Sequence, residues 1–140
     1  MSAAKGPRVL ARPGLEALRR FMNQPGKFQE IIATYVKHGW RLRRALMRPE
    51  TRASLAAGPE IQTLFESAEM RESIVDALWF ARPSHAGREA WELRLVGDTP
   101  YALFETFEAD EAEEDREDVR LEMEARLRDY AQGKSIEARG

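Results

Sequence analysis

The chain has 140 residues, the size of one domain, and 43% of them are hydrophobic, which is enough for a single core. It contains no cysteine, so disulfides, cysteine-ligated zinc and thiolate catalysis are excluded. The formal net charge of −2 is unevenly distributed: residues 1–70 carry 12 Lys and Arg against 6 Asp and Glu, whereas residues 71–140 carry 10 against 18. This asymmetry indicates either an anionic partner for the first half or an electrostatic match between the halves.

The N-terminal residues come first in chain order. Residues 1–12 are small, basic and interrupted by proline, which predicts a disordered segment, and they lack the apolar run of a signal peptide. No stretch of the chain approaches the roughly 18 apolar residues of a membrane span. We therefore expect a cytoplasmic protein with no membrane span.

Helical periodicity dominates residues 13–69. The stretch PGLEALRRFMNQPG predicts a short amphipathic helix that ends at Pro25. Between Lys27 and Arg48 one long helix is predicted, with Gly39 placed where two backbones approach closely. Two shorter helical segments are expected at 49–58 and 59–69. The seam of the long helix is formed by apolar residues and this glycine at spacings of four and three: Phe28, Ile32, Tyr35, Gly39, Leu42 and Leu46.

The period changes after residue 70. Residues 73–83, 89–97 and 101–109 are rich in strand-forming residues and are separated by the turn-like SHAG and GDTP, which predicts a three-stranded antiparallel meander. Trp79 and Trp91 fall on adjacent strands and are expected to pack together. In the third strand, Phe104 and Phe107 have opposite parity, so either both sheet faces are covered or the strand contains a bulge.

The last element is an acidic amphipathic helix over residues 110–133. Asp110 followed by Glu113 suggests a capping box, and Gly133 suits a C-cap. The fold class is therefore α+β, with N-terminal helices, the meander and the C-terminal acidic amphipathic helix in one domain over residues 13–132. Residues 133–140 are expected to form a flexible tail.

Four cations at spacings of four, three and four would form a basic row along the predicted long helix: Lys37, Arg41, Arg44 and Arg48. With Trp40 beside it, the row could bind the phosphates and bases of a nucleic acid. It could equally bind an acidic protein surface, or be an ordinary solvated helix face. The acidic residues between Glu105 and Glu124 offer such a surface within one subunit or across a homodimer.

A second candidate anion site is the turn that contains Arg82, His85 and Arg88. No metal-ligand spacing, nucleotide-binding loop or catalytic triad is recognisable, so neither a cofactor nor a metal is expected. We therefore expect a non-catalytic protein-interaction or regulatory module that recognises an acidic or mixed-charge partner, either as a monomer or as a homodimer. The alternatives are a nucleic-acid-associated accessory protein that uses the basic row, and a small enzyme or anion binder built around the turn.

Overall fold

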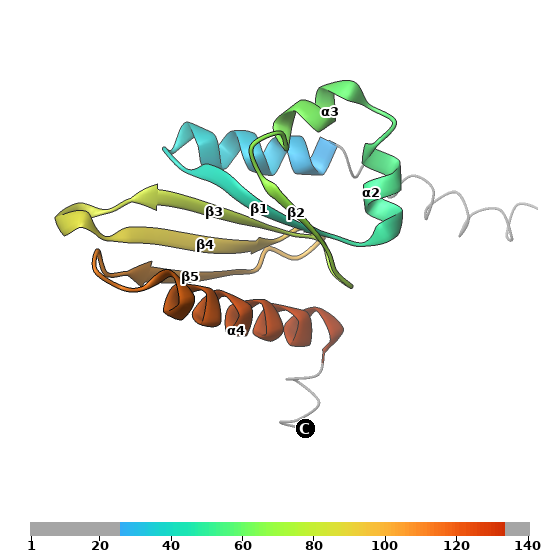
Figure 1. Cartoon of the computed structure of the whole chain (residues 1–140). Helices are drawn as coiled ribbons and strands as arrows, with labels where there is room; N and C mark the ends of the chain where they lie inside the picture. Colours follow the sequence, from blue (N-terminus) through green and yellow to red (C-terminus); the bar gives the residue numbers. More distant parts are fainter. Residues whose placement is uncertain (1–25, 134–140) are drawn as a thin grey trace, which may run out of the picture.

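A computed structural model describes residues 26–133 of the chain. The predictions made for residues 1–25 and for most of the tail fall outside these residues. The described part is a mixed sheet with helices on both sides (Figure 1). In chain order the elements are a helix over residues 26–37, β1 (Arg41–Met47), α2 (Pro49–Leu55), α3 (Pro59–Leu64), β2 (Glu69–Glu72), β3 (Ala77–Pro83), the 3₁₀ turn η1 (His85–Gly87), β4 (Glu89–Leu95), β5 (Ala102–Phe107) and α4 (Glu113–Gln132).

The predicted long helix is wrong, because the chain leaves the helix at Gly39 and continues as strand β1. Gly39 has a φ of +89°, and its N–H donates to the carbonyl of Val36 while the N–H of Trp40 donates to the carbonyl of Tyr35. These two bonds form a Schellman motif, completed by the edge-to-face contact of the Trp40 and Tyr35 rings. No heavy atom lies within 4 Å of a Cβ built on Gly39, so this glycine ends the helix and does not permit a close packing.

The sheet has five strands in the order β2-β1-β3-β4-β5. Strands β3, β4 and β5 are consecutive and antiparallel, but the predicted three-stranded sheet is incomplete, because β1 pairs antiparallel with β3 and β2 pairs parallel with β1. Helices α2 and α3 form the crossover between the parallel strands β1 and β2, which a chain needs to return in the same direction. The α+β class is confirmed; of the two unpredicted strands, β1 lies within the residues assigned to the long helix and β2 lies outside them.

Three layers result, with a separate apolar core on each face of the sheet (Figure 1). The helix over residues 26–37, together with α2 and α3, covers the first face, where Phe28 and Phe80 are buried. Helix α4 covers the second face, where Trp79 packs edge-to-face on Trp91 as predicted, with 5.8 Å between ring centroids. Helix α4 begins at Glu113 after the N-cap Ala112, so the predicted capping box does not form, whereas Gly133 is its left-handed C-cap.

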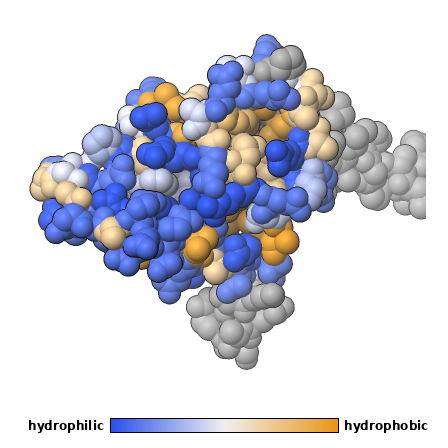
Figure 2. All heavy atoms as spheres, in the orientation of Figure 1, coloured by the Kyte–Doolittle hydropathy of each residue, from blue (hydrophilic) through white to orange (hydrophobic). Residues whose placement is uncertain are grey.

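The alternation along β5 directs its two phenylalanines to opposite faces. Phe107 belongs to the core beneath α4, whereas Phe104 lies across from Glu92 of β4, whose carboxylate accepts a hydrogen bond from Tyr35 in the helix over residues 26–37. That helix therefore reaches as far as β4 and leaves Phe104 exposed. In Figure 2 hydrophilic side chains cover most of the visible side of the molecule, with hydrophobic ones gathered in smaller patches.

Candidate functional site

The four cations of the predicted basic row do not share one face. Lys37 ends the helix over residues 26–37 and is exposed, as is Arg41 at the start of β1. Arg44 is buried beneath α4, and Arg48 is half-buried after β1. The predicted basic row does not form, because a turn and a strand replace the helix on which its spacing depended.

Arg44 is the centre of a buried ionic network that joins β1 to α4. Its Nη1 donates to Glu124 at 2.9 Å, its Nη2 to Glu117 at 2.9 Å and its Nε to Glu69 at 3.1 Å. Glu124 also accepts a 2.8 Å hydrogen bond from the indole of Trp79. Of the acidic surface predicted between residues 105 and 124, Glu117 and Glu124 do meet a cation of the first half within one subunit.

These contacts shift the pKa values of the partners. Burial alone would lower the pKa of Arg44, but the hydrogen bonds and charges of Glu117 and Glu124 outweigh it and raise the pKa. Desolvation would raise the pKa of Glu117, yet hydrogen bonds from Arg44 and Arg120 hold it below its usual value. Glu69 is likewise lowered, against its own desolvation, by Arg71 and Arg44. These pKa shifts favour the charged forms of Arg44, Glu69 and Glu117, which suits a structural connection.

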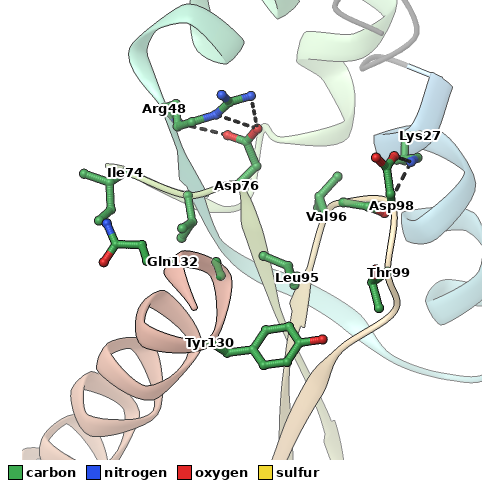
Figure 3. A pocket seen from close by; sticks show the side chains of 13 residues that line it. Lys27, Arg48, Ile74, Asp76, Leu95, Val96, Asp98, Thr99, Tyr130 and Gln132 are labelled. Atoms are coloured by element: carbon green, nitrogen blue, oxygen red, sulfur yellow. Dashed lines mark hydrogen bonds and ion pairs between the residues drawn. The ribbon is translucent and has the colours of Figure 1, made fainter. Parts of the chain in front are cut away.

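A hollow of about 750 Å³ lies at the end of the sheet where the helix over residues 26–37 begins and α4 ends (Figure 3). Leu95, Val96 and Tyr130 contribute apolar walls, and Ile74 lies at the rim. Its charged lining residues are Lys27, Arg48, Asp76 and Asp98. By size alone it is a plausible ligand site.

The charged side chains of this hollow form ion pairs and hydrogen bonds with one another. Asp76 is buried and accepts hydrogen bonds from the backbone N–H and the guanidinium of Arg48 at 2.9–3.2 Å, and from the hydroxyl of Thr51 at 2.8 Å. Lys27 reaches the carbonyl of Gly97 and the carboxylate of Asp98 on the far rim (Figure 3). A carboxylate with so many donors fastens α2 to the start of β3, and we assign it no catalytic role.

Two predicted site residues from separate candidate sites, Trp40 and Arg82, are brought together on the first face of the sheet. The Arg82 guanidinium lies 4.5 Å from the centroid of the Trp40 ring, and its Nη1 donates at 2.8 Å to the carbonyl of His38. Phe104 packs edge-to-face on Trp40, at 6.4 Å between centroids, and is 58% exposed. We call Trp40, Arg82 and Phe104 the open triad.

A second set of the same residue types lies beneath α4. The Arg120 guanidinium lies 4.4 Å from the centroid of Trp91, and Phe107 packs edge-to-face on Trp91, at 6.4 Å. Arg120 is 2% exposed and Phe107 is 1% exposed. We call Trp91, Arg120 and Phe107 the closed triad, and its burial gives it a structural role.

The residues of the predicted turn site do not share partners. His85 is exposed in η1, a turn in which Ala86 and Gly87 both adopt positive φ. Arg88 pairs with Glu108 at 3.1 Å, whereas Arg82 lies over Trp40. The three side chains therefore form no common anion site.

Sequence reasoning missed Phe104 as a site residue and Glu124 as the partner of Arg44. The opposite parity of Phe104 and Phe107 was the signal that could have identified Phe104, because only one of the two can lie on the face that α4 covers. Nothing in the sequence pairs Arg44 with Glu124, which lie 80 residues apart. Gly39 followed by Trp40 was a further signal that was misread, since this pair ends the helix and does not belong to a helix seam.

No group of three or more His, Asp or Glu residues between 26 and 133 is arranged to hold a metal ion. Within the same range no helix is long and apolar enough to cross a membrane. No protein-family model matches the sequence, and comparisons with curated proteins and with solved structures find no significant match. The proposals below therefore rest on the geometry.

Proposed function

We propose that the protein is a non-catalytic interaction module that binds an acidic segment of a partner protein through the open triad. The observation that carries the proposal is the 58% exposure of Phe104 beside a tryptophan and an arginine whose positions are already fixed. Tryptophan and arginine are enriched among the residues that dominate binding energies at protein interfaces.

The geometry favours binding because little order has to be created. Arg82 is positioned by the Trp40 ring and by the carbonyl of His38, so its side chain loses little conformational freedom when a partner arrives. Phe104 offers apolar surface that water now covers. The arrangement suits a partner that presents an apolar side chain to Phe104 and a carboxylate to Arg82.

Charge near the triad favours an acidic partner. Lys37 and Arg41 are exposed and close to Trp40 in the sequence, and neither has an ion pair among the described residues. Exposed cations of this kind increase association rates with acidic surfaces and make binding salt-sensitive. A partner of mixed charge would use the same cations.

The nucleic-acid alternative is weakened by the geometry. Arg44 and Arg48 are engaged with carboxylates, and Trp40 is 8% exposed, which leaves little ring surface for a base. Binding of nucleic acid, or of a second copy of the chain through the same surface, is an alternative result that the test below can detect.

The test is affinity capture from a lysate of the source organism at low salt, with and without nuclease. Bait proteins are the wild type, Phe104→Ala, Arg82→Ala and, as a matched control, Leu121→Ala, which removes an exposed side chain from α4. We expect one protein partner that resists nuclease and binds about tenfold more weakly to Phe104→Ala, equivalent to about 1.4 kcal/mol. Leu121→Ala should bind as the wild type does.

Three outcomes would contradict the proposal. Loss of the captured material on nuclease treatment would favour the nucleic-acid reading. Equal capture by all four baits would place the binding surface elsewhere. A dimer that light scattering detects in the wild type and not in Phe104→Ala would make a second copy of the chain the partner.

A further inference from the structure

A small polar cavity on the second face of the sheet, separate from the open triad, has the features of an anion site. Its volume is about 230 Å³, and it lies between the start of α4 and strands β1, β2 and β4. Its lining includes three arginines, Arg43, Arg44 and Arg120, and the ring of Trp91. A volume of this size accommodates a phosphate or carboxylate group with a few water molecules.

Arg120 has a donor that the protein leaves unused. Its Nε donates to Glu117 at 2.9 Å, and its Nη2 donates to Glu113 and lies 2.9 Å from the same Glu117 oxygen. The side chain is only 2% exposed, and its Nη1 is buried with no hydrogen-bond partner among the described residues. A buried guanidinium N–H without an acceptor is unfavourable, so an acceptor at this position would stabilise the protein.

Arg43 supplies a second available guanidinium. It lies 5.2 Å from the centroid of Trp91, the ring that Arg120 also contacts at 4.4 Å. Arg43 is exposed and has no ion pair within residues 26–133. Two guanidiniums therefore converge on one indole, and one of them is free to move toward a ligand.

The cavity also contains three carboxylates, and only one of them is easily displaced. Glu69 pairs with Arg44 and Arg71, and Glu89 pairs with Arg116 and accepts from the Trp91 indole at 2.8 Å. Glu113 is the first residue of α4, and its side chain is 73% exposed. Releasing so exposed a carboxylate into water costs little, because Glu113 is already largely hydrated and Arg120 keeps Glu117 as a partner.

We propose that this cavity binds an oxyanion, a phosphate or carboxylate group of a small molecule, which displaces Glu113 and accepts hydrogen bonds from Arg120 and Arg43. The planar guanidinium binds both kinds of group in bidentate fashion. With Glu113 rotated out, the lining keeps three arginines against Glu69 and Glu89, an excess of one positive charge. The anion thus replaces an internal carboxylate that occupies its place.

The experiment titrates the full chain with inorganic phosphate and, separately, with acetate at constant ionic strength, and follows the Trp91 indole N–H resonance by NMR. We expect saturable shifts, at least fivefold tighter binding by Glu113→Gln, and at least fivefold weaker binding by Arg43→Ala. Arg126→Ala, which removes an exposed arginine further along α4, should bind as the wild type does. These variants change exposed side chains, so folding is preserved.

Saturation by phosphate alone assigns a phosphate-bearing ligand, and saturation by acetate extends the site to carboxylates. The proposal is overturned if neither anion saturates the Trp91 signal. It is equally overturned if Glu113→Gln and Arg43→Ala leave the affinity unchanged, because the anion would then be an adventitious surface ion only.

Discussion

The open and closed triads combine the same three residue types, one arginine over one tryptophan beside one phenylalanine, on opposite faces of one sheet. The arginine-to-ring distances are 4.5 and 4.4 Å, and both phenylalanines come from β5, three residues apart. Both tryptophans are buried, but Arg82 and Phe104 of the open triad are exposed, whereas Arg120 and Phe107 are buried beneath α4. Similar local contacts are therefore enclosed in the core on one face, and on the other they leave Phe104 exposed to solvent.

The largest expected difference concerns the two phenylalanines. Phe107→Ala should lower the free energy of unfolding by about 3–5 kcal/mol, because it leaves a cavity in a packed core. Phe104→Ala should change it by less than about 1 kcal/mol, since the ring is already largely in water. Urea unfolding monitored by circular dichroism measures both values. Equal losses of unfolding free energy in the two variants would show that Phe104 is as important to the core as Phe107.

The arginines should differ in the same direction. Arg44→Met leaves Glu124 buried without its cation and should cost about 3 kcal/mol, the lower end of the range for broken buried pairs because Glu117 keeps Arg120 as a partner. Arg82→Met removes an exposed cation–π contact and should cost about 0.5–1 kcal/mol. Chemical denaturation of the two variants tests this order, and a larger loss from Arg82→Met would reverse our assignment of roles.

Acid sensitivity should arise on the α4 face. The folded-state pKa values of Glu69 and Glu117 are lowered, so the stability that they contribute is fully present above about pH 4.5, near the unfolded value for glutamate, and is lost as the pH falls through the folded values. Unfolding free energies between pH 3 and 6 should fall less steeply with acid in Arg44→Met than in the wild type. Arg82→Met should retain the wild-type slope, and parallel slopes in all three proteins would argue against the network.

The smallest effect is expected at high pH on the face of the open triad. Desolvation, with the hydrogen bond to Glu92 and its charge, raises the pKa of Tyr35 to about 12. Because the folded value exceeds the unfolded value of about 10, the contribution of Tyr35 is fully present below pH 10 and is lost as the pH rises toward 12. Between pH 9 and 11 the wild type should therefore lose more stability than Tyr35→Phe. A difference that stays constant with pH would contradict this.

Local sequence signals determined the class of the fold and most of its elements, including the short helices α2 and α3 that were expected at 49–58 and 59–69. Alternation and turn residues located β3, β4, β5 and their antiparallel order, and the acidic amphipathic pattern located α4. Strand β1 was missed because Leu42 and Leu46 also fit a helical period, and the left-handed Gly39 between helix and strand was not recognised as a helix stop. Strand β2 has four residues, too short for a distinct pattern.

Burial and pairing across the sheet were decided by tertiary structure. The sequence supplied Arg44 and Arg82 as equally polar residues, and nothing local indicates that one would be enclosed by α4 and the other would lie on Trp40. Residue 44 meets residues 117 and 124 only because β1 is the second strand in the sheet and α4 crosses its face. Which charges are neutralised within the protein, and which remain available to a partner, depends on contacts between residues far apart in the chain.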